Sequence, residues 1–92
     1  MTSVSVRIPT ILRSYTGGSA EVTACPGTLR EVIAGLDASY PGIAGRILDE
    51  AGKLRRFVNV YVADEDVRFA QGLETLVPEG TQVSVIPGVA GG

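Results

Sequence analysis

The sequence predicts an α+β fold, in which a mixed sheet of four to five strands is covered on one face by one main crossover helix. Two observations support this prediction. Alternating apolar and polar residues mark strands near both ends of the chain. A single long apolar stripe of helical period lies between them. One sheet with a helix on one face is the compact arrangement for such an order of elements.

The first strands are predicted at residues 3–8 and 20–25. In residues 3–8, Val4, Val6 and Ile8 alternate with polar neighbours, which is the period of a half-buried strand. A turn at residues 16–19 contains two adjacent glycines. Two short strands joined around a Gly-Gly turn favour a β-hairpin.

The main helix is predicted to begin at Thr28, because Thr28 and Glu31 have the spacing of a capping box. Pro41-Gly42 is expected to end it. Its apolar residues recur three and four positions apart, which gives an amphipathic helix one core-facing stripe. These residues are Leu29, Val32, Ile33, Leu36 and Tyr40.

The second half is predicted to hold the remaining strands. A short helical turn is expected near residues 43–48, and the strongest strand pattern is at residues 57–62. Residues 64–66 are predicted as a turn, 67–69 as a short strand and 82–86 as the last strand. Three further apolar residues are predicted to fill the core from a loop or short helical turn: Leu73, Leu76 and Val77.

This order of elements, β-β-α-β-(β)-β, is that of the β-grasp or ubiquitin-like fold. The 92 residues are expected to form one domain, since two cores of half this size would each be too small. We place the domain at residues 1–86 and a flexible tail at residues 87–92, because Pro87 has no N–H with which to continue a strand ladder.

Composition excludes several classes of function. A net charge of −2 disfavours nucleic acid as a partner. One cysteine and no histidine disfavour a zinc site, an iron–sulfur cluster and a disulfide framework. The absence of histidine also removes the commonest general acid or base, so the chain is predicted to be no enzyme, with no bound metal or cofactor. No membrane span or signal peptide is visible, which favours a cytoplasmic protein.

The tail is the feature that indicates function. It has small side chains and no charge, and it ends in Gly91-Gly92. Glycine passes through narrow channels and adopts any backbone conformation that a channel imposes. A terminal carboxylate is a poor electrophile until it is activated, for example as an acyl-adenylate. A frayed chain end is the alternative, but the β-grasp pattern before the tail favours a reactive terminus at Gly92.

The chain resembles the MoaD/ThiS family of ubiquitin-like sulfur carriers over essentially its whole length. Residues 83–92 (VSVIPGVAGG) are similar to the family's closing strand, proline bend and Gly-Gly end, and residues 79–83 to the turn before it. Gly88 stands where the family usually has a second proline. Residues 8–13, 16–18, 53–62 and 64–69 resemble a narrower branch, the carriers of thiocarboxylate-dependent cysteine biosynthesis.

The resemblance implies a set of partners. An ubiquitin-activating-type adenylyltransferase and sulfurtransferase would use ATP to adenylate Gly92 and convert it to a thiocarboxylate. The sulfur would then pass to a biosynthetic enzyme, such as a cysteine-synthase-like or thiazole-synthase-like protein, for the synthesis of cysteine, thiamine, molybdopterin or another sulfur-containing metabolite. Gly91 is implied to give access to the enzyme's channel.

A docking surface is predicted beside the root of the tail. If the strands alternate as described, Phe57, Tyr61, Ile86 and Arg7 share the sheet face opposite the core. Apolar residues exposed on such a face are candidate anchors for a partner. The tail itself completes the predicted partner-binding set with Pro87, Gly88, Val89 and Ala90.

Other residues of chemical interest are predicted to be structural. Cys25 is expected to behave as a small hydrophobe, and the acidic residues 64–66 as a solvated turn without the spacing of a calcium loop. Glu74 and Glu79 form no enclosed acid/base pair. The basic group of Lys53, Arg55 and Arg56 is predicted to be a solvated loop, with steering of an acidic partner as the alternative.

Two other functions remain compatible with the sequence. A protein modifier of the ubiquitin type would transfer the same activated Gly92 to a lysine, and a plain β-grasp binding module would use the sheet face alone. The modifier is distinguished by its isopeptide-linked product, and the binding module by the absence of any ATP-dependent change at its C-terminus.

Overall fold

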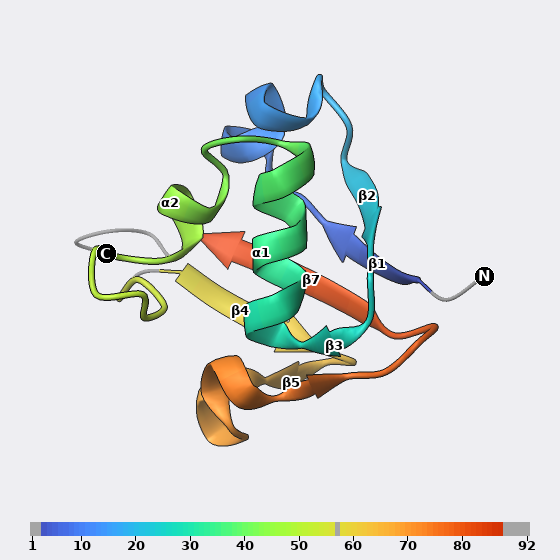
Figure 1. The fold of residues 1–92 in the computed structure, drawn as a ribbon, viewed down its shortest axis with the longest axis vertical. Helices are drawn as coiled ribbons and strands as arrows, with labels where there is room; N and C mark the ends of the chain where they lie inside the picture. The colour runs from blue at the N-terminus through green and yellow to red at the C-terminus, as the bar shows by residue number, and fades with distance from the viewer. Residues whose placement is uncertain (1–2, 57, 88–92) are drawn as a thin grey trace.

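A computed structural model of the chain describes residues 3–56 and 58–87. Helix α1 (Leu29–Ser39) lies across one face of a five-stranded sheet, as Figure 1 shows. The strands run in the order β2-β1-β7-β4-β5. This is the β-grasp arrangement predicted from the sequence. The bounds of the strands are Val4–Arg7 for β1, Glu21–Ala24 for β2, Val58–Val62 for β4, Glu65–Asp66 for β5 and Gln82–Pro87 for β7.

The last strand occupies the centre of the sheet. Strand β7 pairs in parallel with β1 and antiparallel with β4. Strands β2 and β5 pair antiparallel with β1 and β4, so they complete the sheet on either side. Strand β7 is paired on both sides from Gln82 to Ser84, whereas its last residues, Ile86 and Pro87, pair with β4. Strand β4 therefore holds the point at which the tail begins.

Helix α1 begins and packs as predicted. The amide of Glu31 donates to Oγ1 of Thr28 at 3.2 Å, and the amide of Thr28 donates to Oε1 of Glu31 at 2.9 Å, which completes the capping box. Four residues of the stripe are buried and Tyr40 packs partly buried against the same core. From the sheet, the core receives Val4, Val6, Val22, Val60, Val62, Val83 and Val85.

Gly35 lies on the exposed side of α1, and a Cβ at this position would meet no atom within 4 Å. We expect Gly35→Ala to stabilise the protein by roughly 0.5–1 kcal/mol, because alanine loses less backbone entropy in a helix. The measurement is the urea midpoint at unchanged slope. The matched control is Gly42→Ala, which must destabilise: Gly42 has φ of +98° and its Cβ would lie 3.0 Å from Tyr15. A lower midpoint for Gly35→Ala would contradict the described packing.

The connection between β1 and β2 is longer than a simple hairpin turn. The two strands pair antiparallel as predicted, but a 3-10 helix, η1 (Thr10–Thr16), lies between them. It buries Leu12 and leaves Ile11 69% exposed. Gly17 follows with φ of +67°, in the left-handed region that glycine adopts without strain. The predicted turn therefore ends η1 and does not join the strands by itself.

The region after β4 differs from its prediction. Ala63 and Asp64 have positive φ and form the two-residue turn that sets Val62 opposite Glu65. Strand β5 thus includes two of the residues predicted as a turn. Residues 67–69, predicted as a strand, form a 3-10 helix, η2 (Val67–Phe69). The carboxylate of Asp66 accepts a hydrogen bond from the amide of Arg68 at 2.9 Å and so caps this helix.

A second, two-stranded sheet was not predicted. Strand β3 (Gly27–Thr28) pairs antiparallel with β6 (Leu76–Val77), which follows the 3-10 helix η3 (Gly72–Glu74). Leu73 and Val77 enter the core as predicted, but Leu76 is 70% exposed. The prediction for Leu76 is wrong because successive side chains of a strand point to opposite faces. The short helical turn predicted near residues 43–48 is α2 (Ala44–Ile47).

Candidate functional site

The root of the tail is the end of β7. The strand extends to Pro87, which stands opposite Val58, one residue beyond the predicted end at Ile86. Five predicted tail residues lie outside the described part of the chain, as does Phe57, so their roles stay predictions. The tail residues in question are Gly88, Val89, Ala90, Gly91 and Gly92.

The structure brings the described members of the predicted docking surface together. Arg7 and Tyr61 both stand opposite Ser84, one from each neighbouring strand of β7. Ile86 lies two residues further on, so it faces the same side of the sheet. Arg7 and Ile86 are exposed, the latter at 47%, and Tyr61 is half-buried. We call Arg7, Tyr61 and Ile86 the outer-face patch.

A hollow of about 460 Å³ adjoins the outer-face patch at the end of β7. Ile86 and Arg7 form one side of it, and Pro9, Ile11 and Arg13 form the other. Nε of Arg13 donates to the carbonyl of Ile8 at 3.1 Å, which orients its guanidinium on η1. The surface beside the tail root therefore extends onto η1. The sequence did not indicate this contribution, because its pattern of apolar residues did not predict a helix there.

Arg68 is a structural residue whose role the sequence did not indicate. Its Nη2 donates to the carbonyls of Arg55 at 2.7 Å and Val58 at 2.8 Å, and its Nη1 donates to Oδ1 of Asn59. It therefore ties η2 to the chain that enters β4. No sequence signal could have found it, because the acceptors are mainly backbone carbonyls that any residue would carry.

The remaining candidates occupy the surface. Cys25 is exposed, contrary to its expected behaviour as a small hydrophobe. Glu74 forms an ion pair with Arg30 at 3.0 Å. In residues 3–56 and 58–87, no group of three or more His, Cys, Asp or Glu is placed to hold a metal ion. No helix in the same residues has both the length and the apolar character needed to cross a membrane.

Comparison with known proteins identifies relatives along the whole chain. Residues 6–92 match the model of the ThiS family. The sulfur carrier protein CysO of Mycobacterium tuberculosis is 53% identical over 92 residues, which cover 98% of this chain and 99% of that protein. The crystal structure of the M. tuberculosis CysO superimposes with a TM-score of 0.90 at 52% identity, covering 94% of this chain and 99% of that one.

Two other solved structures are similar. A chain of the BexX/CysO complex of Amycolatopsis orientalis matches with a TM-score of 0.91 and 49% identity, covering 97% of this chain and 99% of that chain. The small archaeal modifier protein 1 of Methanosarcina acetivorans matches with a TM-score of 0.81 and 26% identity, covering 100% and 98%. The similar proteins at about 50% identity are named as carriers, which agrees with the prediction that the chain is no autonomous enzyme.

Proposed function

The chain belongs to the ThiS family, and we propose that it is a sulfur carrier whose C-terminal Gly92 carboxylate is activated and converted to a thiocarboxylate. The observation that carries the proposal is the likeness to CysO over 98% of this chain, together with the ThiS family match, which extends from residue 6 to residue 92. The chain supplies the reacting carboxylate and its partner supplies the catalytic groups.

The proposed chemistry has two steps. A carboxylate oxygen of Gly92 attacks the α-phosphorus of ATP in an ubiquitin-activating-type enzyme, and pyrophosphate leaves. A sulfur nucleophile then attacks the carbonyl carbon of the acyl-adenylate and AMP leaves, so one carboxylate oxygen is replaced by sulfur. ATP belongs to the activating enzyme, and the carrier binds no cofactor of its own in this proposal.

The geometry of the described residues supports this use. Strand β7 lies between β1 and β4 and stays paired with β4 as far as Pro87, so the start of the tail is held at the sheet. The outer-face patch and its hollow lie beside that position and offer exposed apolar and cationic groups. A partner that binds there has the first residue of the tail at its surface, which lowers the entropic barrier to threading the end into a channel.

For the next step, we propose that the thiocarboxylate sulfur passes to a cysteine-synthase-like enzyme. The similarity to CysO supports this branch over a thiazole-synthase-like acceptor or molybdopterin formation. The BexX/CysO complex of A. orientalis shows that a similar carrier assembles with another protein. The proposed compartment is the cytoplasm, where an ATP-dependent activating enzyme would find its nucleotide.

The experiment that tests the proposal is the intact mass of the protein after incubation with ATP, the activating enzyme and a sulfide source. The expected change is the mass of one sulfur in place of one oxygen, and it must be absent when ATP is omitted. An unchanged mass, with an activating enzyme that modifies another carrier in parallel, would reject the proposal.

The protein modifier is the second candidate, and the similarity to the small archaeal modifier protein 1 supports it. Both functions share the activation of Gly92 and differ in the product. A thiocarboxylate is the product of the carrier, whereas the modifier yields an amide bond between Gly92 and a lysine amine. Mass analysis of the adducts formed in cell extract with ATP distinguishes the two.

Replacement of Ile86 by Asp tests the docking role of the outer-face patch. Ile86 is 47% exposed, so we expect the fold to survive while the Kd for the activating enzyme rises about tenfold or more, since apolar anchors dominate such interfaces. The control is Leu76→Asp, which introduces the same charge at a 70% exposed leucine on β6. Titration calorimetry with equal affinity for both variants would show that the patch takes no part in binding.

A further inference from the structure

A second hollow, of about 500 Å³, lies between η1 and α2. Pro9, Ile11 and Val58 contribute apolar surface to it, and Arg46 and Arg55 contribute positive charge. Of the described residues that line it, none is Asp or Glu. We call it the α2 hollow. It shares Pro9 and Ile11 with the hollow beside Ile86, so the two form one continuous surface around Ile11.

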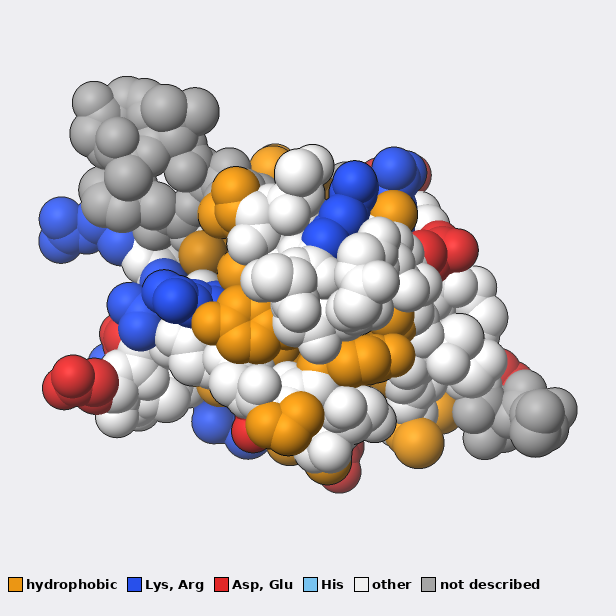
Figure 2. Space-filling view, turned by 90° about the horizontal axis from the view of Figure 1, so that it is seen from above, with side chains coloured by type: hydrophobic (Ala, Val, Ile, Leu, Met, Phe, Trp, Pro, Cys, Tyr) orange, Lys and Arg blue, Asp and Glu red, His pale blue; other side chains and the backbone are white. Residues whose placement is uncertain are grey.

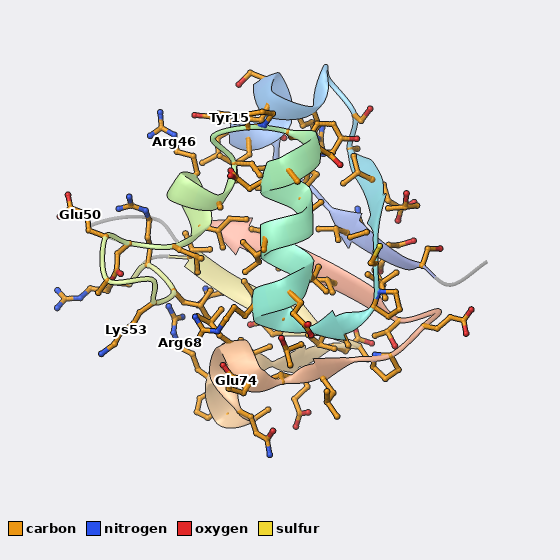
Figure 3. The ribbon with its side chains drawn as sticks, in the orientation of Figure 1. Tyr15, Arg46, Glu50, Lys53, Arg68 and Glu74 are labelled. Carbon is orange, nitrogen blue, oxygen red and sulfur yellow. The ribbon has the colours of Figure 1, made fainter. Side chains whose placement is uncertain are left out.

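Neutral groups hold the two arginines in place. Nε of Arg46 donates to the hydroxyl of Tyr15 at 2.8 Å, and its guanidinium carbon lies 6.0 Å from the centre of that ring. Figure 3 shows Tyr15 and Arg46 reaching toward one another from η1 and α2. Nε and Nη2 of Arg55 both donate to the carbonyl of Gly45, at 3.0 and 2.8 Å. Each guanidinium is thus oriented and keeps N–H groups for another acceptor.

Among the residues that the structure describes, no carboxylate oxygen lies within 4 Å of the guanidinium nitrogens of Arg46 or Arg55. Within residues 3–56 and 58–87, the only ion pair closer than 4 Å is that of Arg30 and Glu74. The hydrogen bond to Tyr15 raises the pKa of Arg46 above its usual value. Figure 2, which looks onto the η1 end of the molecule, shows one group of Lys and Arg side chains at the left of an apolar surface and a second group at its upper right.

Arg46 and Arg55 bring two positive charges to one partly apolar hollow, in a chain with ten acidic and eight basic residues. Arginine with neighbouring apolar surface is the composition of protein interfaces, where the guanidinium binds a carboxylate through two N–H groups. A strongly hydrated phosphate would gain little from the isoleucine, proline and valine that line the hollow.

We propose that the α2 hollow binds an acidic side chain of the activating enzyme, with an apolar neighbour of that side chain resting on Ile11 and Pro9. The inference rests on the proposed function and extends it, because it assigns a second contact beyond the outer-face patch. A second contact, at a distance from the outer-face patch, further restricts the rotation of the carrier on its partner. The charges also speed the encounter between the two proteins.

The test compares two double variants that change the net charge equally. Arg46→Glu with Arg55→Glu reverses the charge of the α2 hollow. Arg30→Glu with Lys53→Glu does the same at a hollow near η3, which also receives Gly72 and Glu74. We expect the first pair to raise the Kd for the activating enzyme about thirtyfold at low salt, and the second to change it less than about threefold. Circular dichroism checks the fold of each protein.

A milder pair, Arg46→Gln with Arg55→Gln, keeps hydrogen-bond donors and covers the case in which the reversal unfolds the protein. We expect it to raise the Kd about tenfold. An equal loss of affinity in the two charge-reversed variants would indicate only long-range repulsion between the carrier and the activating enzyme. That result would overturn the proposal. Equal affinity of all variants would also overturn it, while the ATP-dependent mass change of the wild-type chain would leave the proposed function intact.

If the wild-type chain is neither bound nor modified by the activating enzyme, the proposed function fails, and the hollow is tested by itself. The probe is a synthetic peptide of alternating Glu and Leu, titrated into ¹⁵N-labelled protein, with inorganic tripolyphosphate as comparison. Shifts of the amide signals of Ile11, Arg46 and Arg55 with the peptide support an acidic protein partner. Shifts with tripolyphosphate alone, or with neither, overturn it.

Discussion

Deletion of Gly92 is expected to reduce thiocarboxylate formation at least about hundredfold, with no change in stability. The deletion withdraws the reacting carboxylate by one residue, a distance of about 3.5 Å along an extended chain. Misplacement of a reacting group by about 1 Å can already lower a rate about hundredfold. Gly92→Ala keeps the length but adds a Cβ at the reacting end, and we expect a similar loss.

The measurement is the fraction of protein with sulfur in its intact mass, taken over a time course with ATP and the activating enzyme. Cys25→Ser is the matched control: Cys25 is exposed and is the only thiol of the chain, so its loss excludes sulfur bound at cysteine. We expect normal loading of Cys25→Ser. Normal loading of the Gly92 deletion would remove the C-terminus from the mechanism, and the sulfur-carrier proposal with it.

The largest effect on stability is expected for Ile33→Ala, at about 2–5 kcal/mol. Ile33 is 2% exposed and lies on the face of α1 that packs on the sheet. Truncation to alanine removes its buried methyl and methylene groups and leaves a cavity that the sheet cannot close. For a domain of this size, a loss of that order is a large part of the total stability.

Urea unfolding followed by circular dichroism measures the effect. Leu76→Ala is the control, since it shortens an aliphatic side chain in the same way at a position that is 70% exposed. We expect it to change the free energy of unfolding by less than about 0.5 kcal/mol. If the two variants were equally stable, Ile33 would not be part of the core described.

Patterns in the sequence predicted the elements that are stabilised by contacts between residues close together in the chain. The capping box of Thr28 and Glu31 and the stripe from Leu29 to Leu36 involve neighbours within one or two helical turns, and both are confirmed. The alternation in β7 assigned Val83 and Val85 to the core and Ile86 to the outer face, since the period of a strand is two.

The missed features depend on contacts between distant segments. Strand β6 forms because Leu76 and Val77 meet Thr28 and Gly27 from another part of the chain. Arg68 acts on carbonyls whose positions follow from the fold alone. The Arg46–Tyr15 contact likewise joins residues 31 positions apart. The tail residues 88–92 and Phe57 lie outside the described part of the chain, so their predicted roles await the experiments above.

The parallel pairing of β1 with β7 has a consequence for synthesis of the protein. The first strand to leave the ribosome can pair early with β2, but its other neighbour, β7, is the last strand to be made, so β1 and β7 join across nearly the entire chain. Contacts of such long range form slowly and late. A chain that stops early lacks the central strand of its sheet, and such a product has neither a stable domain nor the Gly-Gly end. Under the proposed function, presentation of the Gly92 carboxylate is thereby coupled to the folding of the domain that carries it.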